Sequence, residues 1–386
     1  MNDRMPEAGY RQALSLLRQG QWDAARETLL HVAGTGFTPA IKELGILELH
    51  GIGCQADVGS AVSRFQQSLD EPESQFELSR CLYFGYGLGR DQSAALHWLK
   101  QAAKQGFAEA LRVMAMLAEY VDKEKAHTSA ADNHAQRLMW KAAQAGDNFA
   151  RYLYKSGLVS AIKISPEDMD TFIDAMIWPR HTVRTGMPLH QQPGVTLFDG
   201  ALSRWQCEYI RFRGAPHLRP SMVLDPATGK RIQDPVRKSD SAGFDWFLED
   251  IVVRQIMQAA TALVGIDVAR SEPLHLLRYG VGQEYKPHYD FVGGLEYTGR
   301  FADQQRTDTL CLYLNDVPAG GETAFPRLNL SIPPKAGQML HFQNVDAMGR
   351  PFVDSLHCGK PVHRGEKWLA TLWIRKTNTG RGLTNE

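Results

Sequence analysis

Hydrophobic positions recur every three to four residues through the first part of the chain, from about residue 8 to residue 155. This spacing gathers apolar side chains on one face of a helix. Ala, Leu, Gln and Lys, which favour helices, dominate the segment, and Asp70-Glu71-Pro72 is typical of a junction between two helices. The pattern therefore predicts an almost entirely helical domain.

The helical segment also repeats. Gly51-Ile52-Gly53 with Asp57 and Ala61 recurs 34 residues later as Gly85-Tyr86-Gly87 with Asp91 and Ala95, and Ala102-Ala103 with Gly106 recurs 40 residues later as Ala142-Ala143 with Gly146. A fixed period in this range is typical of an α-solenoid of helical hairpins, in which neighbouring pairs bury the faces that one pair cannot bury alone. The recurring residues resemble Sel-one-like repeats, which are related to tetratricopeptide repeats. The resemblance implies a scaffold that binds a protein or peptide, and the alternative is a helical spacer that only adds stability.

From about residue 186 the pattern changes to short runs rich in β-branched and aromatic residues, separated by Gly and Pro. Strands are expected at 194–199, 272–280, 308–315, 338–343 and 367–375, and helices near 202–212 and 246–264. Many short strands with few helices favour a sandwich or jelly roll. We therefore expect a multidomain α + β chain, with a repeat domain at 8–155, a connector at 156–185, a β-rich domain at 186–378 and a tail at 379–386.

Composition narrows the class of protein. Equal numbers of basic and acidic residues, 43 of each, give no reason to expect nucleic acid or an anionic membrane surface as a partner. The first residues lack a basic stretch followed by an apolar core, and no apolar run approaches the roughly 20 residues that cross a bilayer. Five scattered cysteines without a CxxC pair are typical of reduced thiols. These features predict a cytoplasmic protein that does not bind membranes.

Candidate metal ligands lie in the β-rich part. His288 and Asp290 are two residues apart, so both side chains point to the same face of an extended segment. An imidazole with a carboxylate suits a borderline cation, and His357 is the best candidate for a third ligand from a distant strand. Two histidines and one carboxylate form the facial triad of non-haem iron(II) oxygenases, which leaves positions for a bidentate oxo acid and O₂. A His-x-Asp triplet alone would be weak evidence, because such triplets are common.

Lys367 strengthens this interpretation. It follows His357 by ten residues, so one hairpin would carry the chain out of the metal site and return the lysine beside it. Its ammonium would supply a compact positive charge for the far carboxylate of a dicarboxylate whose near end chelates iron. A cupin-like domain that binds another ion without 2-oxoglutarate is the alternative, and Lys367 argues against it.

Four ordered motifs over residues 190–376 resemble the catalytic domain of the prolyl 4-hydroxylases, within the iron/2-oxoglutarate dioxygenases. They are Y-x-x-G-Q-x-Y-x-x-H-x-D-F at 279–291, R-x-x-T-x-x-x-Y-L-N-D-V at 306–317, G-G-E-T-x-F-P at 320–326 and H-x-G-x-P-V-x-x-G-x-K-W at 357–368. The resemblance implies a double-stranded β-helix with iron on His288, Asp290 and His357. It also implies that Lys367 pairs with the C5 carboxylate of 2-oxoglutarate, with the hydroxyls of Tyr279 and Thr323 as neighbours.

The same resemblance implies further residues on the substrate side: Tyr285, Arg306, Arg237, Ser239 and Trp373. The fit weakens near 225–236 and 291–305, where loops that face the substrate are expected. The implied cofactors are Fe(II), 2-oxoglutarate, O₂ and L-ascorbate. The leading hypothesis is a dioxygenase that hydroxylates a peptidyl proline in a protein recruited by the repeats. The alternatives are a hydroxylase of another residue or of a small molecule, and a repeat-based interaction protein with a vestigial oxygenase domain.

Overall fold

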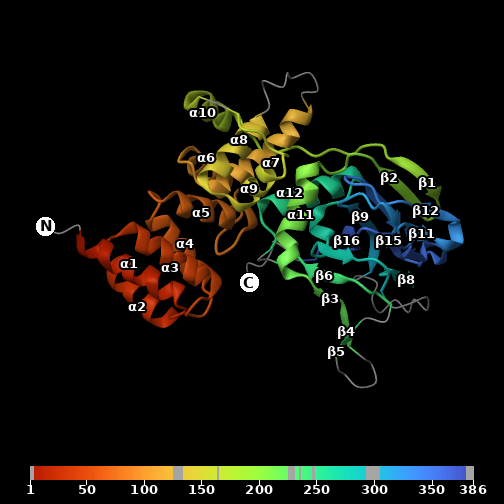
Figure 1. Cartoon of the computed structure of the whole chain (residues 1–386), viewed down its shortest axis with the longest axis horizontal. Helices are drawn as coiled ribbons and strands as arrows, with labels where there is room; N and C mark the ends of the chain where they lie inside the picture. The colour runs from red at the N-terminus through yellow and green to blue at the C-terminus, as the bar shows by residue number, and fades with distance from the viewer. Residues whose placement is uncertain are drawn as a thin grey trace. The chain divides into compact units, whose positions relative to one another are not determined.

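The computed structural model describes residues 4–124, 134–162, 165–224, 231–233, 236–245, 248–292 and 305–379. The chain divides into two compact units, one ending at Pro179 and the other beginning at Arg180. The first unit is helical and the second is built on β-sheets (Figure 1). Apart from Thr379, the predicted tail at 379–386 lies outside the described residues.

Helices that follow one another along the first unit pack together, so the predicted helical hairpins are confirmed. The helices are α1 (Arg4–Arg18), α2 (Trp22–Ala33), α3 (Thr38–His50), α4 (Val58–Gln67), α5 (Pro72–Phe84), α6 (Gln92–Lys104), α7 (Ala108–Glu124), α8 (His134–Ala145), α9 (Asn148–Lys155) and α10 (Pro166–Ala175).

Equivalent residues make the same turns in successive repeats. Gly51 follows α3 and Gly85 follows α5 with φ of 65° and 82°, a conformation that glycine adopts without strain. Asp57 and Asp91 then cap α4 and α6, each accepting a hydrogen bond of 2.9 Å from the backbone N–H three residues later. The glycine and aspartate of the repeat signature therefore end one helix and begin the next.

The predicted connector, 156–185, contains a helix. Ser165 begins α10 by accepting a hydrogen bond from the backbone N–H of Asp168 at 3.1 Å. The helix packs against α6, where Lys104 Nζ lies 2.5 Å from an Asp174 carboxylate oxygen. This part of the connector is therefore a packed element of the first unit.

The second unit contains two main antiparallel sheets. The larger has the order β1-β2-β13-β9-β16-β7-β6-β3, the smaller has the order β12-β11-β14-β8, and β10-β15 and β4-β5 form short pairs. The strands are β1 (Met187–Gln191), β2 (Gly194–Phe198), β3 (Arg219–Pro220), β4 (Met222–Leu224), β5 (Arg231–Gln233), β6 (Asp240–Gly243), β7 (His275–Tyr279), β8 (Tyr285–His288), β9 (Arg306–Tyr313), β10 (Ala319–Gly320), β11 (Thr323–Phe325), β12 (Leu330–Ile332), β13 (Met339–Gln343), β14 (His357–Gly359), β15 (Val362–Arg364) and β16 (Lys367–Arg375).

The two main sheets share one apolar core, as expected for a double-stranded β-helix. Leu277 and Phe342 enter it from the larger sheet, and Phe325 and Ile332 enter it from the smaller. Side chains alternate along a strand, so Leu276 points to the opposite face of the larger sheet. On that face β7 packs against α11 (Arg204–Gly214). The jelly-roll prediction is confirmed.

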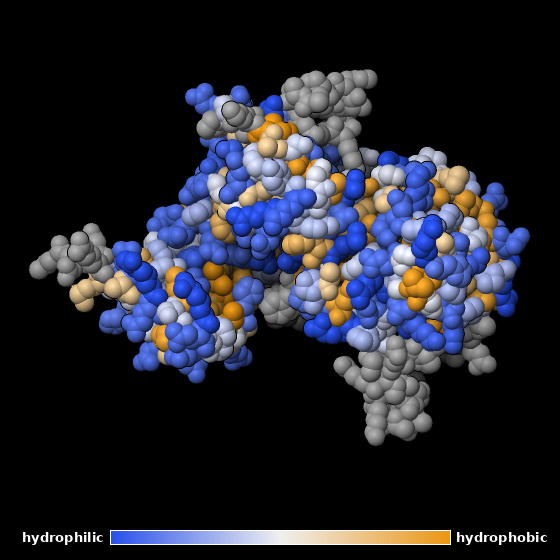
Figure 2. Space-filling view, in the orientation of Figure 1, coloured by the Kyte–Doolittle hydropathy of each residue, from blue (hydrophilic) through white to orange (hydrophobic). Residues whose placement is uncertain are grey.

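All of the predicted strands form, together with both predicted helices. The second helix, α12 (Ile251–Leu263), begins later than predicted because Asp250 caps it, accepting a hydrogen bond of 3.0 Å from the backbone N–H of Val253. None of the helices that the structure describes is both long and apolar enough to span a bilayer. On the face drawn in Figure 2, hydrophilic residues predominate and hydrophobic residues form separate patches.

Candidate metal centre

The register of two neighbouring strands brings the candidate ligands together. His288 is the last residue of β8 and His357 is the first residue of β14, and the two lie opposite each other across the antiparallel pair. Their ring centroids are 4.3 Å apart. Asp290 follows β8 after one residue, on the same side as His288. His288 and His357, which are 69 positions apart in the sequence, therefore meet because the strands that carry them are paired.

The three side chains offer ligand atoms that all lie within 4.8 Å of one another, and they form the one such group found in the described ranges. Asp290 Oδ1 is 3.6 Å from His288 Nε2, and Asp290 Oδ2 is 3.6 Å from His357 Nε2. Asp290 and His357 are each 6% exposed. The predicted facial triad is present, with its ligand atoms converging on one point.

Backbone carbonyls orient both imidazoles. His288 Nδ1 lies 2.8 Å from the carbonyl oxygen of Lys286, and His357 Nδ1 lies 3.0 Å from that of Ser355. A carbonyl only accepts hydrogen bonds, so each Nδ1 carries a proton and each Nε2 is left to face Asp290. Burial and the neighbouring His357 lower the pKa of His288 to about 3, so this imidazole is neutral at pH 7.

This donor set fits iron(II). The buried Asp290 carboxylate faces the Nε2 atoms of both histidines, and a divalent cation between these atoms would supply a counter-charge for it. Two imidazoles and one carboxylate are the donors that non-haem iron(II) selects.

A pocket lies beside the three ligands and reaches Lys367, the first residue of β16. Lys367 is 3% exposed, and no described carboxylate forms an ion pair with it. Its Nζ lies 3.5 Å from Thr323 Oγ1, and burial lowers the pKa of the ammonium to about 8. Burying a cation without a partner is costly, so this end of the pocket is suited to an anion.

The path by which Lys367 reaches the site differs from the prediction. The expected single hairpin from His357 to Lys367 is wrong: β14 belongs to the smaller sheet, β16 belongs to the larger sheet, and β15 lies between them in the sequence. The chain therefore passes from the smaller sheet to the larger sheet between the two strands. As a result, the ligand and the lysine approach the pocket from opposite sheets.

Two tyrosines enclose the ammonium. Lys367 Nζ is 5.8 Å from the ring centre of Tyr279 and 5.7 Å from that of Tyr313. Tyr313 also donates a hydrogen bond of 2.8 Å to Thr323 Oγ1. Tyr279 and Thr323 were predicted neighbours of Lys367, whereas Tyr313 was missed. Tyr313 could have been found from the alternation of side chains along β9, which places it on the same face as Thr309 and Cys311.

Two of the predicted substrate-side residues line the pocket, Tyr285 and Trp373. The Tyr285 ring stacks on His288, with centroids 3.4 Å apart. Cys358 lines the pocket as well, and all five cysteines are free thiols.

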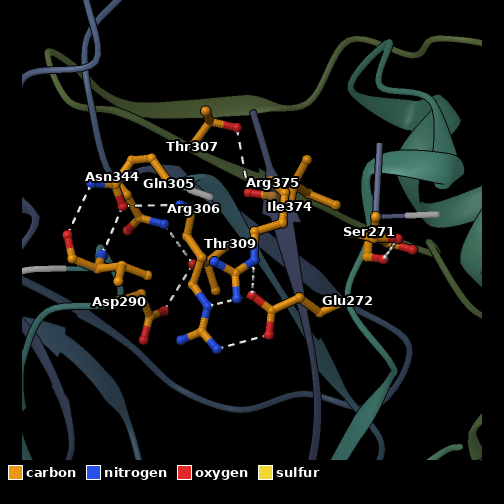
Figure 3. A network of polar contacts seen from close by, with 12 residues as sticks. Ser271, Glu272, Asp290, Gln305, Arg306, Thr307, Thr309, Asn344, Ile374 and Arg375 are labelled. Carbon is orange, nitrogen blue, oxygen red and sulfur yellow. Dashed lines mark hydrogen bonds and ion pairs between the residues drawn. The ribbon is translucent and has the colours of Figure 1, made fainter. Parts of the chain in front are cut away.

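The other three predicted residues lie behind this lining. Arg306 donates two hydrogen bonds to Glu272, at 2.6 and 2.8 Å (Figure 3). Its guanidinium lies 4.0 Å from the centre of the Trp373 ring. Arg237 lies over the Tyr285 ring at 5.6 Å. Ser239 is buried, with its hydroxyl 2.9 Å from that of Ser221.

The structure therefore gives Arg306 a supporting position against Trp373, and it adds Glu272, which the sequence did not indicate. The loops expected to face the substrate, near 225–236 and 291–305, lie largely outside the described residues.

Comparisons with known proteins agree with this site. Residues 274–375 match the family model of the 2OG-Fe(II) oxygenase superfamily, and residues 72–107 match the Sel1 repeat. Prolyl 4-hydroxylase subunit alpha-1 of Rattus norvegicus is 33% identical over 187 residues, which is 48% of this chain and 35% of that protein. "Probable prolyl 4-hydroxylase 10" of Arabidopsis thaliana is 33% identical over 203 residues, which is 48% of this chain and 69% of that protein.

Two solved structures are also similar to parts of the chain. A viral collagen prolyl hydroxylase from Paramecium Bursaria Chlorella virus-1 is 27% identical, covers 47% of this chain and 96% of that protein, and has a TM-score of 0.39. A Sel1 repeat protein from Oxalobacter formigenes is 22% identical, covers 39% of this chain and 60% of that protein, and has a TM-score of 0.32.

The chain thus spans about a third of the rat relative and about two thirds of the Arabidopsis relative. The matched region contains the three converging ligands and the buried lysine. The chain belongs to the 2OG-Fe(II) oxygenase superfamily: it contains a dioxygenase domain related to the prolyl 4-hydroxylases, and a Sel1 repeat region precedes this domain in the sequence.

Proposed function

We propose that this dioxygenase hydroxylates a peptidyl proline in a protein that the helical repeats recruit. The observation that carries the proposal is the 33% identity to prolyl 4-hydroxylases over a region that includes the complete triad and Lys367. The aromatic walls formed by Tyr285 and Trp373 support it, because a proline ring is apolar and packs well against aromatic faces.

In this proposal different residues of the pocket bind the metal and the cosubstrate. His288, Asp290 and His357 would hold iron(II), and Lys367 would bind the far carboxylate of 2-oxoglutarate with the hydroxyl of Thr323 beside it. When bound, iron(II) and 2-oxoglutarate, with L-ascorbate maintaining the reduced metal, supply the O₂-dependent oxidation of a C–H bond. The protein would orient these groups, and Tyr279 and Thr323 beside Lys367 are nearly inaccessible to water.

The affinity for 2-oxoglutarate should fall as the pH rises above about 8. In the free enzyme burial lowers the pKa of Lys367 to about 8, so the ammonium that pairs with the carboxylate is lost above that pH. The KM for 2-oxoglutarate should then rise by about tenfold for each further pH unit. Steady-state kinetics from pH 6.5 to 9.5 would measure this. Lys367→Arg is the control, because a guanidinium keeps its charge and should flatten the rise; an equal rise in both proteins would contradict the prediction.

The choice of proline is tested by product analysis. The full chain, with iron(II), 2-oxoglutarate and ascorbate, is incubated with a library of proline-containing peptides and with a matched library in which alanine replaces each proline. We expect a mass gain of one oxygen atom on proline residues, together with succinate formation, in the first library alone. Oxidation at other residues would favour the broader hydroxylase. Absence of substrate-coupled succinate with both libraries and with folded protein substrates would favour a vestigial oxygenase.

Recruitment by the repeats is tested with the protein that contains the modified sequence. If the repeats bind it, the intact protein should have a lower KM than its own short peptide at a similar kcat. Equal KM values would instead favour the helical spacer.

A further inference from the structure

A hydrogen-bond chain ends on the metal-binding carboxylate. Thr309 Oγ1 lies 2.8 Å from Asp290 Oδ2, and Asn344 Nδ2 lies 2.9 Å from Thr309 Oγ1 (Figure 3). Thr309 and Asn344 are both 0% exposed. Thr309 lies in β9, which the larger sheet places between β13 and β16, and Asn344 directly follows β13. The residues that donate these hydrogen bonds therefore lie on, or directly after, central strands of the larger sheet.

The chemistry of the groups fixes the direction of this chain. The Asp290 carboxylate only accepts hydrogen bonds, so the hydroxyl of Thr309 must donate its proton to it. The hydroxyl oxygen then accepts from the amide of Asn344. Both donors are thus committed, and each bond polarises the next toward the carboxylate.

Stability alone does not account for Asn344. Its amide oxygen Oδ1 is buried and has no hydrogen-bond partner in the part of the chain that the structure describes. An unsatisfied buried carbonyl destabilises a fold, so an apolar residue of similar size would suit this position better. The contact that the side chain does make is with Thr309. This points to orientation of that hydroxyl as its contribution.

We propose that Thr309, oriented by Asn344, is a positioning residue that fixes the rotation of the Asp290 carboxylate for metal binding. A carboxylate free to rotate must lose that freedom when it binds an ion, and a fixed one does not. The bond to Oδ2 also turns Oδ1 toward His288 Nε2. The inference rests on the metal site and is independent of the substrate.

Binding of Co(II) to the full chain, without 2-oxoglutarate, tests this inference. Thr309→Val keeps the size and branching of the side chain and removes the hydroxyl. We expect its Kd for Co(II), measured by competition with a chelator, to rise by about 10- to 100-fold. We also expect a changed visible spectrum of the Co(II) site. Thr309→Ser restores the hydroxyl and should return the Kd and the spectrum close to wild type.

Three further variants separate positioning from packing. Thr307 lies two residues earlier on the same face of β9, and its hydroxyl accepts a hydrogen bond from Arg270 at 3.0 Å. Thr307→Val should therefore leave the Co(II) affinity unchanged. Asn344→Ala should weaken Co(II) binding less than Thr309→Val, and the double variant should bind no more weakly than Thr309→Val alone, because Asn344 acts through Thr309.

Wild-type Co(II) affinity in a folded Thr309→Val protein would overturn the inference, and so would a Thr309→Ser protein as weak as Thr309→Val. If Thr309→Val fails to fold, Asn344→Ala becomes the test, because it leaves β9 unchanged. Wild-type Co(II) affinity in Asn344→Ala would then overturn the inference. Failure of the wild-type chain to bind Co(II) at all would instead remove the metal site itself.

Discussion

Replacing His357 by alanine is expected to reduce substrate-coupled turnover of 2-oxoglutarate to the background of the assay. The substitution removes one of three converging ligands and leaves Asp290 buried with a single imidazole. Two protein ligands at the end of a pocket bind iron(II) weakly and do not fix the remaining coordination positions. His288→Ala should have the same effect. Succinate formation and Co(II) binding, measured on the same preparations, would show whether activity and metal affinity are lost together.

His341→Ala provides the matched control. His341 lies in β13 of the same unit, and its Nε2 is 2.9 Å from Asp308 Oδ1. It does not line the pocket, so its removal should leave turnover close to wild type. Helical circular dichroism should be retained in all three variants, because the repeat unit has its own core. Substrate-coupled turnover that survives in His357→Ala or His288→Ala would contradict the ligand assignment.

Local patterns predicted the helical repeats and five of the strands of this protein. Short runs rich in β-branched and aromatic residues located β9 and β16, and the repeated Gly51 and Gly85 located the ends of α3 and α5. The ligands His288 and Asp290 were predictable for the same reason, because two residues in an extended segment share a face. Each of these inferences depends on neighbours in the sequence, where the geometry of the backbone decides which side chains lie together.

Contacts between distant segments were not predictable in this way. Thr309 and Asn344 are 35 residues apart, and Arg306 and Glu272 are 34 residues apart. Each pair meets because of strand order and register in the larger sheet, which the sequence pattern does not specify. The approach of Lys367 was misjudged for the same reason. A separation of ten residues is equally compatible with a hairpin in one sheet and with a crossing between two sheets.

Replacing Lys367 by alanine should weaken the binding of 2-oxoglutarate by about 2–5 kcal/mol, because it leaves a buried carboxylate without its partner charge. The KM for 2-oxoglutarate should rise by at least about 30-fold. Metal affinity should change little, since Lys367 enters from β16 and the ligands lie on and just after β8 and β14. Kinetics at varied 2-oxoglutarate, with Co(II) titration of the same protein, would separate the two effects.

Lys360→Ala is the control for this experiment. Lys360 belongs to the same sequence motif, but it is exposed and its Nζ contacts Ser331 at 3.1 Å. Its loss should leave the KM for 2-oxoglutarate unchanged. Thermal unfolding of the protein without 2-oxoglutarate provides an independent test of this role. Because Lys367 is a buried cation without a described carboxylate partner, Lys367→Met should unfold at a higher temperature than wild type when no 2-oxoglutarate is present. If Lys367 only stabilised the fold, Lys367→Met would unfold at a lower temperature than wild type, and Lys367→Ala would leave the KM for 2-oxoglutarate unchanged. Those two results together would contradict the role of Lys367 in binding the cosubstrate.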